Sequence, residues 1–440
     1  MENEKNEISI FERLSNWSRS SVTLKLASIT FLTLMLLIPQ SMVEDLIQER
    51  QEAKAFATNE VNNIWANSQV VSGPIITVPF IVEIITEGKI SRVKKFANFL
   101  PDDLSVNGNI SPESLKRGIY KIVVYKSKLD IKANFEKLKN FPNAKEVLWN
   151  EAYLTFGISD LRGIRENLNL KINGKVAEIE AGTKNNSSIK SGVTVLLNDI
   201  NEETTNIPFS ISLDLQGSNY LKFIPMGKTT SVKLSSSWDS PSFIGNFSPK
   251  ERVVNEEGFS AYWKVLDLNR NFPQSWINNQ YSPSEDSSFG VNLLLSVDDY
   301  QRSMRSVKYS LMTIVLVFLV FFLTEIINKK KIHAFQYTLV GLAIILFYTL
   351  LVSISEHTNF NVSYLLSSII VTTMIGLYSI SIFNNMKLSI ILVLTIVGIF
   401  TFIFVTLQLE EFALLIGTVG LTAILGITMY STKNIKWNKD

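Results

Sequence analysis

Cysteine is absent from the 440 residues, and histidine occurs only twice, at His333 and His357. The lack of thiols excludes disulfide bonds, thiolate catalysis and zinc–thiolate sites. The long middle segment, residues 44–304, contains neither residue type. It therefore cannot build a Ser-His-Asp hydrolase, a Cys-His nucleophile or a histidine-ligated catalytic zinc. We expect a protein that is not an enzyme, with no catalytic residues, no metal ligands and no cofactor.

The chain also lacks an excess of charge of either sign, because 42 basic residues are balanced by 40 acidic ones and the net charge is only +2. Nucleic acid is therefore excluded as an expected partner, since phosphate binding needs a concentrated basic face. The one dense basic run, Lys329–Lys331, lies between two apolar runs. In that position lysines act as a signal for membrane topology.

What the chain has in excess is long apolar runs, and each is about 20 residues, enough to cross a bilayer core as a helix. A cleaved signal peptide is the competing interpretation of the first run, but no small-x-small cleavage site follows it, so an uncleaved anchor is favoured. The lipid bilayer is therefore the expected partner. The six expected spans cover residues 22–43 and about 307–327, 335–355, 363–383, 388–407 and 411–431.

The distribution of lysine predicts how these spans are oriented. The triple-lysine turn is expected in the cytoplasm, whereas the other end of that hairpin carries Glu356 and His357 without lysine or arginine and is expected outside. Basic residues also mark the N-terminal segment 1–21 and the tail 432–440, which predicts that both termini are cytoplasmic. The segment between the first and second spans is then extracytoplasmic.

That segment is expected to begin with a helix over residues 44–72 and to continue as a β-rich domain over 73–304. Apolar and polar residues alternate in short runs such as Ile211–Leu215, which is typical of antiparallel sheets with one buried face. Turn pairs such as Asn107-Gly108 suit hairpins. A short helix is expected near Asn134–Leu138. The predicted fold is a membrane α-helical bundle of about six transmembrane helices plus a large, mostly β, antiparallel, sandwich-like extracytoplasmic domain.

Few ionisable residues lie near the spans, so each is a candidate functional residue. For Glu325 one interpretation is an interfacial carboxylate that pairs with Lys329 one helical turn on. The other is a membrane-embedded acid that contacts a partner span. Glu356 and His357 form either a polar helix end or a proton-linked pair, because imidazole titrates near neutral pH. Tyr309, at the start of the second span, is a further candidate.

In the β-rich segment, Trp238 and Trp263 lie in aromatic-rich stretches. They either form a binding surface or fill the core of the domain, as large aromatic residues more often do. Ser91 and Lys94 match a Ser-x-x-Lys pattern, but the companion motifs of acyl-serine enzymes are missing. A hydrolase outside the cytoplasm is therefore a minor alternative.

Four stretches carry a family resemblance, and the longest follows the central hairpin of two spans. The matching residues are Glu49-Arg50, Trp65, Gly73-Pro74-Ile75, Val78-Pro79, Pro225-Met226-Gly227, Ser237-Trp238, Pro241-Ser242-Phe243, Gly245, Gly258-Phe259, Ala261, Trp263, Trp276, Asp298, Tyr300-Gln301, Arg305, Lys308-Tyr309, Glu325, His333, Gln336-Tyr337, Gly341-Leu342-Ala343, Phe347-Tyr348, Ser355-Glu356-His357 and Tyr364. In these residues the chain is similar to the inner-membrane CreD family, described as cell envelope integrity proteins. The resemblance adds His333, Gln336 and Tyr337 to the candidate residues.

The resemblance implies a multi-pass protein of the Gram-negative inner membrane with a large periplasmic domain, tied to envelope stress, a two-component regulatory system, colicin tolerance and responses to β-lactams. It supplies neither a reaction nor a ligand. The first functional hypothesis is a non-enzymatic protein of envelope integrity, whose periplasmic β domain binds another envelope protein or envelope component. The alternative is a small-molecule or proton-linked membrane transporter that uses Tyr309, Glu325 or Glu356.

Overall fold

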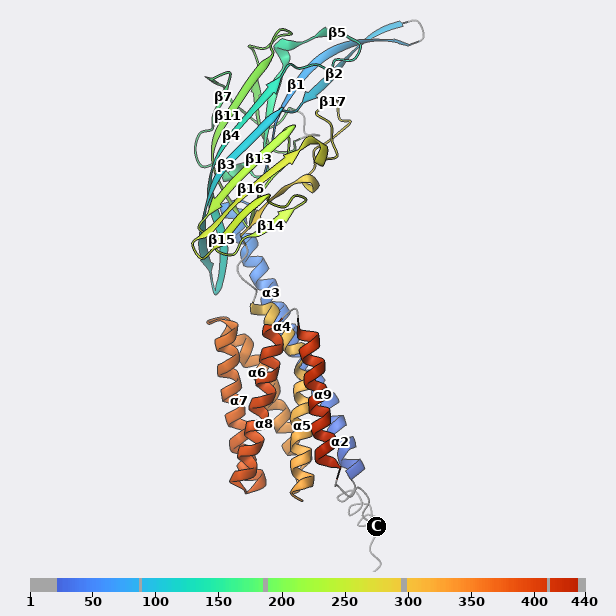
Figure 1. Ribbon diagram of the computed structural model, residues 1–440, viewed down its shortest axis with the longest axis vertical. Helices are drawn as coiled ribbons and strands as arrows, with labels where there is room; N and C mark the ends of the chain where they lie inside the picture. Colours follow the sequence, from blue (N-terminus) through green and yellow to red (C-terminus); the bar gives the residue numbers. More distant parts are fainter. Residues whose placement is uncertain (1–21, 87–88, 185–188, 294–298, 410–411, 434–440) are drawn as a thin grey trace, which may run out of the picture. The chain divides into compact units, whose positions relative to one another are not determined.

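The computed structural model describes residues 22–86, 89–184, 189–293, 299–409 and 412–433 (Figure 1). The expected cytoplasmic N-terminus, most of the basic tail and Asp298 lie outside the described residues. The chain divides into two units, one made of residues 1–53 and 297–440 and the other of residues 54–296. The first unit is helical and the second is built mainly from strands.

Six helical segments in the described part of the chain are long and apolar enough to cross a membrane, which confirms the expected number. The first of them runs from Thr23 to Trp65 and combines α2 with α3, and α4 is a short polar helix that leads into α5. The helices are α2 (Val22–Met35), α3 (Leu37–Trp65), α4 (Asp299–Lys308), α5 (Ser310–Ile327), α6 (Ala334–Ser355), α7 (Phe360–Phe383), α8 (Met386–Gln408) and α9 (Ala413–Thr432).

Asparagine sets the ends of the spans around the two tight turns. The Asn359 side chain accepts a hydrogen bond from the backbone N–H of Val362 at 3.0 Å and so caps the start of α7. Helix α7 ends at Asn384, which adopts the left-handed conformation with φ 47°. The next residue, Asn385, caps α8 by accepting from the N–H of Lys387 at 3.0 Å. Two neighbouring asparagines therefore reverse the chain between two spans.

Aromatic rings and one glycine hold the bundle together. The ring of Phe347 on α6 lies 5.1 Å from that of Tyr364 on α7 and 4.6 Å from that of Phe400 on α8. Gly341 on α6 allows the residue that follows α2 to approach closely, because a Cβ atom there would lie 2.2 Å from Cδ1 of Leu36 and 3.0 Å from Cζ of Phe318. Close approach at a small residue is the usual way in which membrane helices pack.

The β domain contains two sheets within its described residues. The first has ten strands: β14 (Ser242–Gly245), β18 (Phe289–Asn292), β12 (Tyr220–Phe223), β1 (Gln69–Thr86), β6 (Tyr153–Ile158), β10 (Gly192–Leu196) and β9 (Glu180–Ala181) in that order, with β2 (Lys89–Phe99) and β5 (Ala144–Val147) beside β1 and β17 (Ser275–Ile277) beside β2. The second has eight: β15 (Glu251–Asn255), β16 (Gly258–Leu266), β13 (Thr229–Ser236), β3 (Asp103–Arg117), β4 (Tyr120–Glu136), β11 (Asn206–Ser218), β7 (Asn169–Ile172) and β8 (Lys175–Val176). Short 3-10 turns lie at Trp149–Glu151, Leu161–Gly163, Asp267–Asn269 and Glu285–Ser287.

The pairing confirms a mostly antiparallel domain, with parallel pairing only between β1 and β12 and between β13 and β3 in the described part. Strand β11 alternates between buried and more exposed side chains, as the sequence pattern predicts. The two sheets share one hydrophobic core. Rings from both meet in it, as where Phe156 of β6 stacks on Phe209 of β11 at 5.9 Å.

The structure differs from the sequence prediction at three places. Helix α3 ends at Trp65 and β1 begins at Gln69, so the strand starts before the expected boundary at residue 72. The helix expected near Asn134–Leu138 is wrong, because Asn134–Glu136 belong to β4 and pair with β11. Helix α4 starts at Asp299 although the bundle was expected from residue 305, since the charged residues of α4 hide it from a search for apolar runs.

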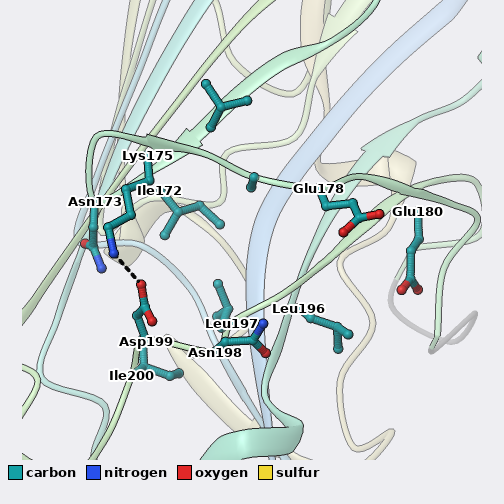
Figure 2. Close-up of a pocket in the computed structure, with 12 residues that line it drawn as sticks. Ile172, Asn173, Lys175, Glu178, Glu180, Leu196, Leu197, Asn198, Asp199 and Ile200 are labelled. Carbon is teal, nitrogen blue, oxygen red and sulfur yellow. Dashed lines mark hydrogen bonds and ion pairs between the residues drawn. The ribbon is translucent and has the colours of Figure 1, made fainter.

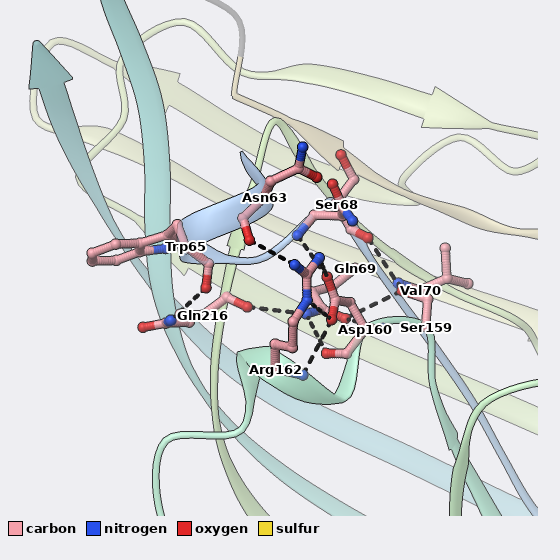
Figure 3. Close-up of polar contacts among 10 residues, drawn as sticks. Asn63, Trp65, Ser68, Gln69, Val70, Ser159, Asp160, Arg162 and Gln216 are labelled. Carbon is pink, nitrogen blue, oxygen red and sulfur yellow. Dashed lines mark hydrogen bonds and ion pairs between the residues drawn. The ribbon is translucent and has the colours of Figure 1, made fainter. Parts of the chain in front are cut away.

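Side chains of the β domain bind the end of α3 (Figure 3). Arg162 donates to the backbone carbonyl of Asn63 at 2.6 Å and to both carboxylate oxygens of Asp160, at 2.9 and 2.6 Å. Asp160 also accepts from the N–H of Asn67 at 2.9 Å. The hydrogen bond from the Arg162 guanidinium is the main cause that holds the pKa of Asp160 at about 2.

Two glutamines complete this junction. Gln69 is fully buried and donates to the backbone carbonyls of Asp160 at 3.0 Å and Gln216 at 3.1 Å. The side chain of Gln216 in turn donates to the carbonyl of Trp65 at 2.6 Å. The last carbonyls of a helix have no partner within the helix itself. Because Arg162 and Gln216 supply these partners, the end of α3 is held firmly against the β domain.

Candidate functional site

A buried carboxylate is the centre of one end of the helical bundle. Glu325, near the end of α5, is only 2% exposed. Its carboxylate forms an ion pair with Lys25 of α2, and it accepts from the hydroxyl of Tyr337 at 3.0 Å and from the N–H of Ile332 at 2.8 Å. Three donors from three segments therefore surround one negative charge. We call Lys25, Glu325 and Tyr337 the inner cluster.

The inner cluster is covered by aromatic rings. The ring of Tyr337 contacts those of Phe318 at 5.5 Å and Phe321 at 6.3 Å, and all three side chains are buried. Apolar walls make an unpaired charge costly, so the carboxylate and the ammonium each depend on the other. The structure supports the interpretation of Glu325 as a membrane-embedded acid that contacts a partner span.

The interpretation in which Glu325 forms an ion pair with Lys329 is wrong. Helix α5 ends at Ile327, and Lys329 lies beyond it in a turn with φ 49°, so the two side chains are not neighbours on one helix face. The i,i+4 rule applies only where the helix continues through both residues. Lys25, which sequence reasoning did not select, takes that place. A lysine within an apolar run was the signal that would have found it.

A second charged group lies at the opposite end of α6. Glu356 accepts from the hydroxyl of Tyr300 on α4 at 3.3 Å and forms an ion pair with Arg50 of α3 at 3.4 Å. We call Arg50, Tyr300 and Glu356 the outer cluster. Together with Lys25 and Glu325, it connects the α2–α3 segment to α5 and α6 at two positions.

Hydroxyl groups line the bundle between the two clusters. Thr313 of α5 and Tyr348 of α6 share a hydrogen bond of 2.8 Å. Ser303, Ser306 and Ser310 lie one turn apart along α4 and α5 and are fully buried. Their Oγ atoms have no hydrogen-bond partner among the described residues. After Thr313 the same helix carries only apolar side chains from Ile314 to Leu323, and Thr324 and Glu325 follow.

The two histidines have different surroundings from these clusters. His333 is exposed and caps α6, where its ring accepts from the N–H of Phe335 at 3.3 Å while Gln336 accepts from the N–H of His333 at 2.9 Å. His357 is exposed in the turn after α6. Neither ring joins a carboxylate cluster, and the described residues contain no group of three metal-ligating side chains. Tyr309 is half-buried at the break between α4 and α5.

The two candidate tryptophans belong to the core of the β domain. Trp263 is fully buried, donates to the carbonyl of Phe247 at 3.2 Å and lies 5.7 Å from the ring of Phe289. Trp238 is half-buried against the same core and donates to the carbonyl of Ser240 at 3.1 Å. The structure favours the core interpretation over a binding surface for Trp263.

Two cavities in the β domain are small and open. One of about 280 Å³ lies beside β7, β8 and β10, where Lys175 and Asp199 form an ion pair of 2.8 Å (Figure 2). Another of about 300 Å³ is lined by residues that include Phe96, Glu151 and Tyr153. Both are at the lower limit of the volumes that small-molecule pockets usually have. Neither supports a deep ligand site.

Comparison with known proteins places this geometry in a family. The family model described as "Inner membrane protein CreD" matches residues 21–438. The chain belongs to the CreD family. It is 30% identical to the inner membrane protein CreD of Escherichia coli strain K12 over 427 residues, which cover 95% of this chain and 94% of that protein. The resemblance noted in the sequence is therefore confirmed.

Membership of the CreD family and the six candidate spans make this chain a multi-pass inner membrane protein. The match runs through both units, so the β domain and the bundle are both part of what the CreD family shares. The family name assigns no reaction to the two clusters.

Proposed function

We propose that this CreD-family chain is a non-enzymatic protein of envelope integrity and stress response, whose β domain lies in the periplasm and binds another envelope component. The observation that carries the proposal is the architecture. A two-sheet domain of more than 200 residues is inserted between the first and second of six candidate spans. Its interior is filled by side chains and the two cavities described above are small, which favours recognition at the surface.

The position of the lysines supports a periplasmic β domain. Lys329–Lys331 follow α5, the second span, and lysines gather on the cytoplasmic side of membranes. The loops at the other ends of α5 and α6 then face the periplasm, together with the β domain. The absence of cysteine from the chain allows a direct test, because any single cysteine introduced is the only one present.

Val176→Cys, in an exposed position of β8, should react with a membrane-impermeant maleimide in cells whose outer membrane has been permeabilised. Lys330→Cys should react only after the inner membrane is broken. The reverse labelling pattern would show that the β domain is not periplasmic and would contradict the proposal.

Binding of an envelope component is tested by photo-crosslinking in growing cells. A photoreactive residue at exposed positions of the β domain should form a covalent adduct with one defined envelope component. The same residue on the exposed face of α9 should crosslink only to lipid. Cells that lack the protein should lose resistance to envelope stress and regain it with the full chain. Absence of any adduct from the β domain in cells that are fully protected would contradict the proposal.

A proton-linked transporter is the second candidate, and the buried Glu325 favours it because ionisable groups within spans are costly and often functional. The apolar stretch of α5 from Ile314 to Leu323 weighs against a continuous polar path. Glu325→Gln and Glu356→Gln should abolish protection from envelope stress if transport is the function. Full protection in both variants, at normal protein levels, would discard it.

A further inference from the structure

Three serine hydroxyls form a column inside the end of the bundle that holds the outer cluster. Ser303 and Ser306 of α4 and Ser310 of α5 are separated by three and four residues, so they share one helical face. All three are fully buried, and their Oγ atoms have no hydrogen-bond partner among the described residues. Because a buried hydroxyl without a partner is costly, the column indicates a partner that the folded chain does not supply.

Other buried hydroxyls of the bundle show what serine ordinarily does in a membrane helix. Ser363, Ser379 and Ser389 each donate to a carbonyl three or four residues earlier, at 2.9, 2.7 and 3.2 Å. This local bond is common for serine and threonine inside helices. The three serines of the column are as deeply buried and make no such bond. Their hydroxyls therefore remain available to a ligand.

Contacts at both ends place the column against α6. At the outer cluster, Tyr300 of α4 donates to Glu356, which ends α6. On α5, Thr313 shares a hydrogen bond of 2.8 Å with Tyr348 of α6. The serines follow one another by single helical turns between these two contacts, and α4 packs on α7 and α8 as well as on α6. Neighbouring helices therefore enclose the column along its length.

Water is the ligand that fits this column. Residues three or four positions apart on one helical face have Cβ atoms about 5–6 Å apart. One water molecule between two such hydroxyls can form hydrogen bonds to both, and buried waters typically form about three bonds to polar groups. Hydroxyl and water both donate and accept, so the bonds can continue from one serine to the next. Three serines carry no charge, so they offer no counter-ion to a dissolved ion.

The column is open at one end and closed at the other. The side chains of Arg50 and Glu356 are 41% and 13% exposed, so the charged groups beside the column reach water. Beyond Thr313, α5 carries only apolar side chains from Ile314 to Leu323. The path from Glu356 to Tyr348 is about 12 Å along α6, less than half of a hydrocarbon core of about 30 Å.

We propose that Ser303, Ser306 and Ser310 bind a file of water molecules that runs from the outer cluster to the Thr313–Tyr348 pair. We call this file the inlet. It is a hydrated site that ends inside the bundle and does not pass through it. The inlet goes beyond the proposed function, because it assigns a binding site to the bundle whichever envelope component the β domain binds.

Single cysteines test the inlet, because the chain has none of its own. The full chain is held in nanodiscs, whose two faces are both open to reagent, and Ser306→Cys or Ser310→Cys is treated with silver ions. Silver ions stay in water and bind the thiolate, and the remaining thiols are counted by alkylation after denaturation. Both positions should react roughly tenfold faster or more than buried controls, because a thiol ionises where water reaches it.

The matched controls are Val307→Cys and Ile314→Cys, since both side chains are fully buried on the same two helices. A substitution near the outer cluster then tests the route. Ser303→Val removes a hydroxyl, adds a methyl group and should slow the reaction of Ser310→Cys roughly tenfold or more, because an apolar site does not hold water. Gln301→Val, at an exposed position of α4, should leave that rate unchanged. Thermal unfolding checks that every variant is folded.

Equal rates at the serine positions and the buried controls would overturn the proposal. If all are slow, the hydroxyls bond to the backbone, and if all are fast, α4 opens locally. A fast Ser310→Cys that Ser303→Val does not slow would exclude entry from the outer cluster and overturn the inlet as described. Neither result bears on the proposed function, which depends on crosslinks from the β domain. Absence of those crosslinks would in turn leave the inlet intact.

Discussion

Lys25 of α2 and Glu325 of α5 form an ion pair inside the helical bundle, although 300 residues separate them along the chain. The pair joins α2, which comes before the β domain in the sequence, to α5, which comes after it. Because Glu325 is almost wholly buried and Lys25 is a third exposed, the carboxylate depends on this pair more than the ammonium does. A second ion pair, between Arg50 of α3 and Glu356 at the end of α6, connects the same two parts of the bundle.

Removing the charge of Glu325 should destabilise the bundle. Glu325→Gln leaves Lys25 without its partner, and we expect a loss of about 1–3 kcal/mol, less than for a fully buried pair because Lys25 reaches water. Thermal unfolding of the purified chain in mild detergent measures it. Exchanging the charges, Lys25→Glu with Glu325→Lys, should recover part of the loss. Lys329→Gln is the control, and a loss of the same size in that variant would contradict the assignment.

The approach of α2 to α6 should depend on Gly341. A Cβ there meets the flexible end of Leu36, so Gly341→Ala should cost little, whereas Gly341→Leu should force the helices apart and cost about 1–3 kcal/mol. Crosslinking between single cysteines on α2 and α6 checks the spacing. Leu36→Ala should restore the spacing in the Gly341→Leu chain. If the two substitutions at Gly341 behave alike, the close contact is not the cause.

Acid should weaken the junction between α3 and the β domain. The pKa of Asp160 is lowered to about 2 by Arg162, from an ordinary value near 3.9, so its ion pair contributes fully above about pH 5 and is lost as the pH falls towards 2. Asp160→Asn should lower the stability at pH 7 by about 1 kcal/mol and flatten the fall in acid. Tryptophan fluorescence unfolding at pH 7 and pH 3 tests this. An identical acid response in Asp160→Asn would assign the response to other carboxylates.

The two tryptophans of the β domain should differ in their effect on stability. Trp263→Ala empties a fully buried site and should cost about 3–5 kcal/mol. Trp238→Ala should cost clearly less, since Trp238 is only half-buried. Denaturant unfolding of the two variants compares them. If Trp263→Ala has normal stability but the β domain no longer crosslinks to its envelope component, Trp263 would instead belong to a binding surface.

Local patterns were enough to predict much of this protein. Apolar runs of about 20 residues determined the six candidate spans, and alternation in segments such as Ile211–Leu215 determined exposed and buried faces of strands. Both depend on residues a few positions apart, which share one face of a helix or strand. Boundaries were less accurate, because α4 is charged and the start of β1 depends on its pairing with β12.

The contacts of the candidate residues were decided only by the tertiary structure. Glu325 has a lysine four residues away in the sequence, but the helix ends before it, and folding instead brings Lys25 from the first span. Trp263 proved to be a core residue because its partners depend on which elements pack together. The cap at His333 is a local contact, made with Phe335 and Gln336 two and three residues along the chain. The exposure of Ile85 and Ile90 is likewise invisible in sequence, because an apolar strand is buried only if another element covers it.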